Sequence, residues 1–137
     1  TRRYGNPASI ESIRITEPDH ICQIPEIMNL RNKNQEHFLC TTLNGASEVI
    51  ATRTITMGLL NHSLVHPREV FADAITDRAA GIICVHNHPS GNPEPSMEDL
   101  KVTRQLFEAG SILGINLIDH LIITKGGINS LRSLGYL

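Results

Sequence analysis

Two histidines, His86 and His88, stand directly after the apolar run Ala80–Val85. Such a run predicts a central strand covered on both faces, and in a strand residues two apart point to the same face. The two imidazoles can then reach one ion, and neutral imidazole is a good ligand for Zn²⁺. Asp99 follows eleven residues after His88. Two histidines and one carboxylate leave a fourth position for water, which is the pattern of a catalytic zinc site rather than a structural one.

The same residues also have explanations that need no metal. A His-x-His pair is, taken alone, more often structural or incidental than a metal site. Ser96 and Asp99 are three residues apart, which fits a capping box that closes the first turn of a helix. The combination nevertheless favours a metal site. The histidines end a predicted buried strand, and a proline-stiffened elbow, Pro89–Pro95, leads from them to the serine and the acid.

The wider pattern resembles the JAMM (MPN+) metalloprotease signature, in which an upstream glutamate precedes H-x-H-P-x(5)-P-S-x-x-D. The matching residues are His86-x-His88-Pro89 and then Pro95-Ser96-x-x-Asp99. The string HNHPSG, with Val65–Glu69 before it and Asp119-His120 after it, is similar to the RadC-like branch of that family. This similarity runs from about residue 11 to the end of the sequence.

The resemblance implies a fold, a cofactor and a reaction. The fold would be a three-layer α-β-α sandwich with a mixed sheet, like that of cytidine deaminase. The cofactor would be Zn²⁺, and the reaction would be hydrolysis of peptide or isopeptide bonds in a protein or peptide substrate. RadC-like proteins often carry an N-terminal helix–hairpin–helix region. This sequence does not include one, so no function of that region is expected here.

The resemblance also assigns roles by position. His86, His88 and Asp99 correspond to the metal ligands, and Ser96 corresponds to the donor that stabilises the oxyanion. The upstream glutamate falls on Glu36, just before a predicted strand. Hydrolysis needs such a group, because a base must take a proton from water and give it to the leaving amine. The other acids that could do so are Glu26, Glu48 and Glu69.

Asp119 and His120 follow one another inside an apolar run. One of the two is expected to point into the site, because residues next to each other in a strand face opposite sides. A carboxylate that orients a ligand histidine is common in zinc sites. The alternative is a hydrogen-bonded pair that belongs to the core.

Local signals predict the elements that position these residues. Before the histidines we expect a helix from Thr16, as its N-cap, to about Leu30 with a bend at Pro25. Strands Phe38–Leu43 and Val49–Met57 should join around Asn44-Gly45. A helix of about ten residues should open at His66–Glu69, with Glu69 reaching back to the amide of His66.

After the elbow, a helix is predicted from Met97 to near Gly114, with one apolar stripe at Val102, Leu106, Ala109 and Leu113. A strand, Leu117–Thr124, and a turn at Gly126-Gly127 should lead into a short tail. Residues 1–10 are expected to be a flexible arm. Residues 11–137 are expected to form one α/β domain, with a mixed sheet between helices.

Charge and composition narrow the possible functions. A formal charge of −2 and a pI near 6.3 argue against non-specific nucleic-acid binding, which depends on clustered Lys and Arg. A RadC-type DNA-repair accessory with a non-proteolytic domain is the main alternative function. A deaminase would need His-x-Glu and Pro-Cys-x-x-Cys, and neither is present. The HNH spelling is not a nuclease motif here, because these residues are adjacent on one strand end.

Three widely spaced cysteines, Cys22, Cys40 and Cys84, form no CxxC pair. This favours a reducing compartment, the cytoplasm. We predict that none of them is a metal ligand or part of a disulfide, and that Cys40 and Cys84 are buried. No stretch approaches the ~20 apolar residues of a membrane span, so no membrane association is expected.

Overall fold

The structure, a computed structural model, describes residues 13–57 and 65–137. The predicted arm at residues 1–10 lies outside this range. Within it, one sheet has the strand order β2-β1-β3-β4-β5. The strands are β1 (His37–Leu43), β2 (Val49–Met57), β3 (Gly81–Asn87), β4 (Asn116–Thr124) and β5 (Gly127–Ser130). The helices are α1 (Pro25–Met28), α2 (Pro67–Thr76) and α3 (Met97–Leu113), with 3₁₀ turns η1 (Pro18–Gln23) and η2 (Asn29–Asn32) on either side of α1.

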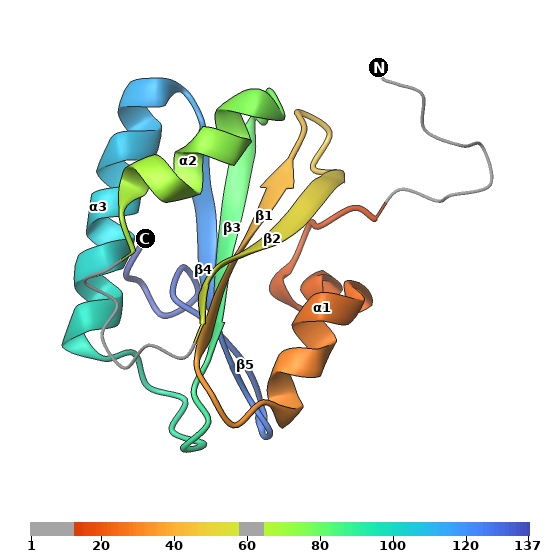
Figure 1. Cartoon of the computed structure of the whole chain (residues 1–137), viewed down its shortest axis with the longest axis vertical. Helices are drawn as coiled ribbons and strands as arrows, with labels where there is room; N and C mark the ends of the chain where they lie inside the picture. Colours follow the sequence, from red (N-terminus) through yellow and green to blue (C-terminus); the bar gives the residue numbers. More distant parts are fainter. Residues whose placement is uncertain (1–12, 58–64) are drawn as a thin grey trace.

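The central strand of the sheet is β3, and all seven of its residues are buried. It pairs antiparallel with β1 and parallel with β4, so the sheet is mixed. Parallel neighbours need a crossover connection, and α3 supplies it between β3 and β4 (Figure 1). The predicted apolar strand is therefore confirmed. It also runs further than expected, to Asn87, so that His86 belongs to the strand itself.

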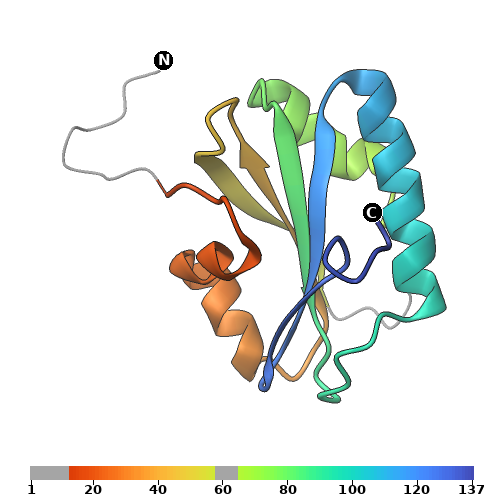
Figure 2. The same ribbon diagram turned by 180° about the vertical axis from the view of Figure 1, so that it is seen from behind.

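Helices cover both faces of this sheet. The α2 and α3 helices lie against one face, and α1 with its flanking turns lies against the other (Figures 1 and 2). Alternate residues of β3 enter the two cores: Ile82 and Cys84 join the cluster with α2 and α3, whereas Ile83 and Val85 join the one with α1. The predicted α/β arrangement, with a mixed sheet between helices, is confirmed. By the same alternation, His86 faces the α3 side.

The continuous helix predicted from Thr16 to about Leu30 is wrong. The segment is divided into η1, α1 and η2, and its N-cap is Glu17, with no side-chain cap hydrogen bond. The division falls at Ile24, which is extended at φ −90° and ψ 116°. A proline disfavours the helical conformation in the residue before it, so Pro25 ends one helical segment and starts another instead of bending a single helix.

Three further sequence predictions meet different outcomes. The hairpin expected around Asn44-Gly45 is confirmed, because β1 and β2 pair antiparallel across it. The cap expected from Glu69 is wrong, since no side-chain cap hydrogen bond forms at His66 and Pro67 begins α2. The predicted tail also contains β5, which pairs with β4. Its four residues, Gly-Ile-Asn-Ser, lack the alternation of apolar and polar side chains that would reveal a strand.

Gly110 lets α3 pass close to the chain that follows it. A Cβ atom at this position would lie 2.3 Å from the Ile115 carbonyl oxygen and 3.3 Å from Phe71 Cζ. Real contacts of this kind do not fall below about 3 Å. Glycine here therefore fixes how closely the C-terminal half of α3 packs against the start of β4.

We predict that Gly110→Ala lowers the free energy of unfolding by about 1–3 kcal/mol, as overpacking does. Backbone has to move away from the methyl group, and this outweighs the roughly 1 kcal/mol that alanine gains in helix propensity. Urea unfolding measures the change. Gly45→Ala, with no atom within 4 Å of the new Cβ, is the control that should keep its midpoint. Equal midpoints for Gly110→Ala and the wild type would contradict the prediction.

Candidate metal centre

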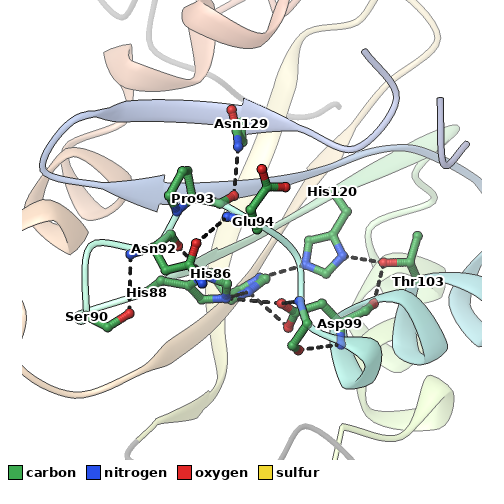
Figure 3. A network of polar contacts seen from close by, with 11 residues as sticks. His86, His88, Ser90, Asn92, Pro93, Glu94, Asp99, Thr103, His120 and Asn129 are labelled. Atoms are coloured by element: carbon green, nitrogen blue, oxygen red, sulfur yellow. Dashed lines mark hydrogen bonds and ion pairs between the residues drawn. The ribbon is translucent and has the colours of Figure 1, made fainter. Parts of the chain in front are cut away.

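His86, His88 and Asp99 meet where β3 ends and α3 begins (Figure 3). One potential ligand atom from each lies within 4.8 Å of the others. The two Nε2 atoms are 2.8 Å apart, and each is 3.1 Å from a different oxygen of the Asp99 carboxylate. His86 and Asp99 are completely buried, whereas His88 is partly exposed. This cluster could hold a metal ion.

The elbow between the two elements sets the position of His88. The backbone amide of His88 donates to the Ile123 carbonyl, so the chain stays against β4 for one residue beyond β3. The side chain of Asn129 on β5 donates to the Pro93 carbonyl at 2.7 Å (Figure 3). The elbow is therefore attached to the sheet on its way back to α3, and it brings Asp99 over the strand end.

His88 turns a ring nitrogen with a lone pair toward the cluster. Its Nδ1 is 2.8 Å from the Asn92 carbonyl oxygen, which can only accept, so Nδ1 carries the hydrogen. Nε2 of the neutral ring is then a ligand atom. A proton competes for the same lone pair. The hydrogen bond to Asp99 raises the pKa of His88, helped by the Asn92 carbonyl and the charge of Glu36 and opposed by burial.

The donor set fits a cation. Two ring nitrogens 2.8 Å apart need a proton or a metal ion between them, since two lone pairs in contact repel. The carboxylate of Asp99 adds negative charge at the same point. Two imidazoles and one carboxylate are a familiar ligand set for catalytic zinc, with one coordination position left open.

Asp99 also caps the helix that carries it. The Ser96 hydroxyl accepts from the Asp99 amide at 3.0 Å, and the Asp99 carboxylate accepts from the Ser96 amide at 2.8 Å. The predicted capping box is therefore confirmed. The cap does not compete with the cluster, because the same carboxylate serves both. Since the Ser96 oxygen is an acceptor in the cap, its own hydrogen is available to a ligand in the adjoining cavity.

A cavity of about 590 Å³ adjoins the cluster, and its walls include Glu36, His88 and Ser96. The structure thus brings the predicted base and the predicted oxyanion donor to one side of His88. The other acids considered lie elsewhere. Glu26 and Glu69 are exposed on α1 and α2, and Glu48 hydrogen-bonds Asn44 at the β1–β2 turn.

Asn87, between the two histidines, is a site residue that the sequence analysis missed. Its side chain accepts from the His37 amide at 2.7 Å and donates to the Gln35 carbonyl at 3.0 Å. One buried side chain thereby ties down the backbone on both sides of Glu36. Its position at the end of a predicted buried strand could have indicated this role, because a buried side-chain amide needs hydrogen-bond partners.

Asp119 and His120 face opposite sides of β4. His120 Nε2 lies 2.8 Å from His86 Nδ1, so this ring contacts a residue of the cluster (Figure 3). The carboxylate of Asp119 instead accepts from Ser130 and from the Arg132 amide. The expectation that one of the two points toward the site therefore holds for His120. Asp119 instead attaches the C-terminal turn to the sheet.

The cysteines take no part in this cluster. All three are free thiols, as predicted, and Cys40 and Cys84 are buried. Those two residues are partners across β1 and β3. The hydrogen bond between the two thiols and burial raise the pKa of Cys84. Among residues 13–57 and 65–137, no helix combines the length and the apolar character that a membrane crossing requires.

Comparison with known proteins places the chain in a family. Residues 15–136 match the RadC-like JAB domain. The chain belongs to the RadC-like JAB domain family. It is 79% identical over 135 residues to a UPF0758 protein of Methanospirillum hungatei, covering 98% of this chain and 60% of that protein. It is 54% identical over 109 residues to the UPF0758 protein YsxA of Bacillus subtilis, covering 80% of this chain and 47% of that protein.

The chain thus spans about half to three-fifths of the length of these relatives. Their names identify the family without stating a reaction. The wider JAB domain family includes metalloproteases, and the His86, His88 and Asp99 cluster is a possible metal site in this chain.

We predict that the wild-type chain binds one zinc ion and that His88→Ala weakens binding by orders of magnitude, because two ligands remain. Competition with a chromogenic chelator and elemental analysis of the dialysed protein measure this. His66→Ala, at an exposed histidine before α2, is the control and should bind zinc like the wild type. Stoichiometric zinc in dialysed His88→Ala would contradict the assignment.

Proposed function

We propose that this domain is a zinc-dependent metallopeptidase that hydrolyses peptide or isopeptide bonds in protein or peptide substrates. One observation carries the proposal. A possible His-His-Asp metal site adjoins a cavity that Glu36 and Ser96 also line. Membership of the RadC-like JAB family supports it. We further propose that the fold is the cytidine-deaminase-like sandwich, on the basis of the mixed sheet with helices on both faces.

His86, His88 and Asp99 would hold the ion. Nitrogen and carboxylate ligands suit Zn²⁺, and three protein ligands are typical of hydrolytic rather than structural zinc. When bound in such a site, zinc lowers the pKa of water to about 7 and polarises a carbonyl. The free thiols are consistent with a reducing compartment, and we propose the cytoplasm as the location.

Glu36 is the proposed general base and acid. Glu36 lines the cavity beside His88, and its charge is close enough to raise the pKa of that ring. It would accept a proton from the attacking water and deliver that proton to the nitrogen of the leaving amine. The hydrogen bonds between the Asn87 side chain and the backbone on either side hold the acid near the histidines. Such transfers contribute about 10²–10⁴-fold to the rate.

Ser96 is the proposed oxyanion donor. Its oxygen is held by the Asp99 amide at the start of α3, which fixes the hydroxyl at the edge of the cavity. The hydroxyl hydrogen would then point at the carbonyl oxygen of the scissile bond as negative charge develops there. A donor placed before the reaction stabilises that charge without reorganisation.

Glu36→Gln should bind zinc like the wild type and lose about 10²–10⁴-fold in kcat, because the amide keeps the size of the side chain but cannot accept the proton. A peptide-library cleavage assay identifies a substrate, and rates are compared at equal zinc occupancy. Glu26→Gln, an exposed acid on α1, is the matched control and should keep the wild-type rate. Equal rates for Glu36→Gln and the wild type would remove Glu36 from the mechanism.

Ser96 needs two variants, because its side chain serves the helix as well as the cavity. Ser96→Ala should lose about 10²–10³-fold in rate and about 1 kcal/mol of stability, as the loss of a cap does. Ser96→Gly should lose the same activity but only a few tenths of a kcal/mol, since glycine is tolerated as an N-cap. Melting temperature and kcat are measured together. Full activity in Ser96→Gly would exclude the hydroxyl from catalysis.

A further inference from the structure

We propose that Thr103 and His120 form a hydrogen-bonded relay that fixes the tautomer of His86 and so makes its Nε2 a metal ligand. The inference rests on the proposed role of His86 as a ligand and extends it to two residues outside the cluster. Both would be positioning residues, because neither side chain reaches the cavity. Nothing in the sequence pattern pointed to Thr103.

The relay is a chain of three short contacts behind the cluster (Figure 3). The Thr103 hydroxyl lies 2.7 Å from the Asp99 carbonyl oxygen, one helical turn earlier on α3. The same hydroxyl is 2.6 Å from His120 Nδ1, and His120 Nε2 is 2.8 Å from His86 Nδ1. All four residues are at most 2% exposed, so water does not compete for these hydrogen bonds.

The carbonyl of Asp99 sets the direction of the first bond. A carbonyl oxygen can only accept, so the single hydrogen of the Thr103 hydroxyl goes to it. The contact to His120 then needs a hydrogen from the ring, because the hydroxyl has none left. His120 Nδ1 therefore carries the hydrogen and donates it to Thr103. If the hydroxyl instead donated to His120, two oxygens would face each other at 2.7 Å with no hydrogen between them.

The contact between His120 and His86 then determines which nitrogen of His86 carries the hydrogen. A neutral His120 with its hydrogen on Nδ1 offers only a lone pair at Nε2. Burial of the whole ring disfavours the charged form. His86 Nδ1 must then donate, which leaves the lone pair of His86 on Nε2, the atom that lies 3.1 Å from the Asp99 carboxylate. Histidine in water prefers the opposite tautomer, so the relay selects the form that can bind a metal through Nε2.

Phe38, which lies on β1, packs against both histidines of the relay. Its ring stacks on His86 with centroids 6.1 Å apart and meets His120 edge-on at 5.5 Å. These contacts hold both imidazole planes where the hydrogen bonds need them. The relay begins at the backbone of Asp99 and ends at a nitrogen facing the carboxylate of the same residue. Helix α3 therefore carries one proposed ligand, Asp99, and also sets the tautomer of another, His86.

The tautomer is measured without any metal. Two-dimensional ¹⁵N NMR of the zinc-free protein labelled at histidine, at alkaline pH, distinguishes the protonated nitrogen of each ring. We expect His86 to carry its hydrogen on Nδ1. In Thr103→Val, which keeps the shape and removes the hydroxyl, His86 should shift toward the Nε2–H form. Thr103→Ser restores the hydroxyl and should restore the wild-type spectrum.

Zinc affinity is the second readout. Groups that orient a ligand histidine typically contribute 10–100-fold to metal affinity, so Thr103→Val should weaken zinc binding by about that factor and Thr103→Ser should recover it. Thr41→Val is the matched control. Thr41 is also fully buried, but its hydroxyl bonds Thr52 on β2, outside the cluster. A loss of zinc affinity in Thr103→Val but not in Thr41→Val separates the relay from a general loss of stability.

Three results would overturn the inference. They are a wild-type His86 with its hydrogen on Nε2, a Thr103→Val protein with unchanged tautomer and zinc affinity, or an equal loss of affinity in Thr41→Val. None of these measurements depends on peptide cleavage. A protein that shows the expected His86 tautomer and zinc affinity but cleaves no peptide would contradict the proposed function. It would not contradict the relay.

Discussion

A single buried carboxylate, that of Asp99, holds the end of the central strand against the start of the crossover helix. One of its oxygens accepts from the Ser96 amide and faces His88, and the other faces His86. A carboxylate removed from water is stable only with such partners. The crossover from β3 to β4 therefore has a fixed starting point, and the position of α3 along the sheet follows from it. Gly110 fixes the other end of the same helix by its close approach to Ile115.

Much of this arrangement was predictable from the sequence because its signals are local. The apolar run before His86 predicted the central strand, and the spacing of Ser96 and Asp99 predicted the helix start. The helix prediction for the segment before β1 was wrong for an equally local reason. Thr16 as an N-cap predicted one helix with a bend at Pro25, but Pro25 forces Ile24 into an extended conformation. Here a proline ends a helical segment instead of bending it.

The hydrogen bonds around the cluster were beyond prediction, because they join residues far apart in the chain. Asn87 bonds the carbonyl of a residue 52 positions earlier, and Thr103 meets a ring 17 positions later. Side chains such as these carry no periodic signal, and only the pairing of β3 with its neighbours brings them together. The proposed ligand residues stood out because the chemistry of metal binding limits residue types. A buried threonine or asparagine can serve many purposes, so its type alone says little.

The two hydrogen bonds of Asn87 hold the backbone around Glu36 whether or not the cluster holds a metal ion. They attach the peptide units on both sides of Glu36 to the residue that lies between the two histidines. The distance from the acid to the histidines is thus a property of the folded backbone. An ion that binds there would find Glu36, the proposed proton acceptor, already in place, and an ion that leaves would not take it away. Exchange of one metal for another would then change the strength of the Lewis acid without moving the backbone that carries Glu36.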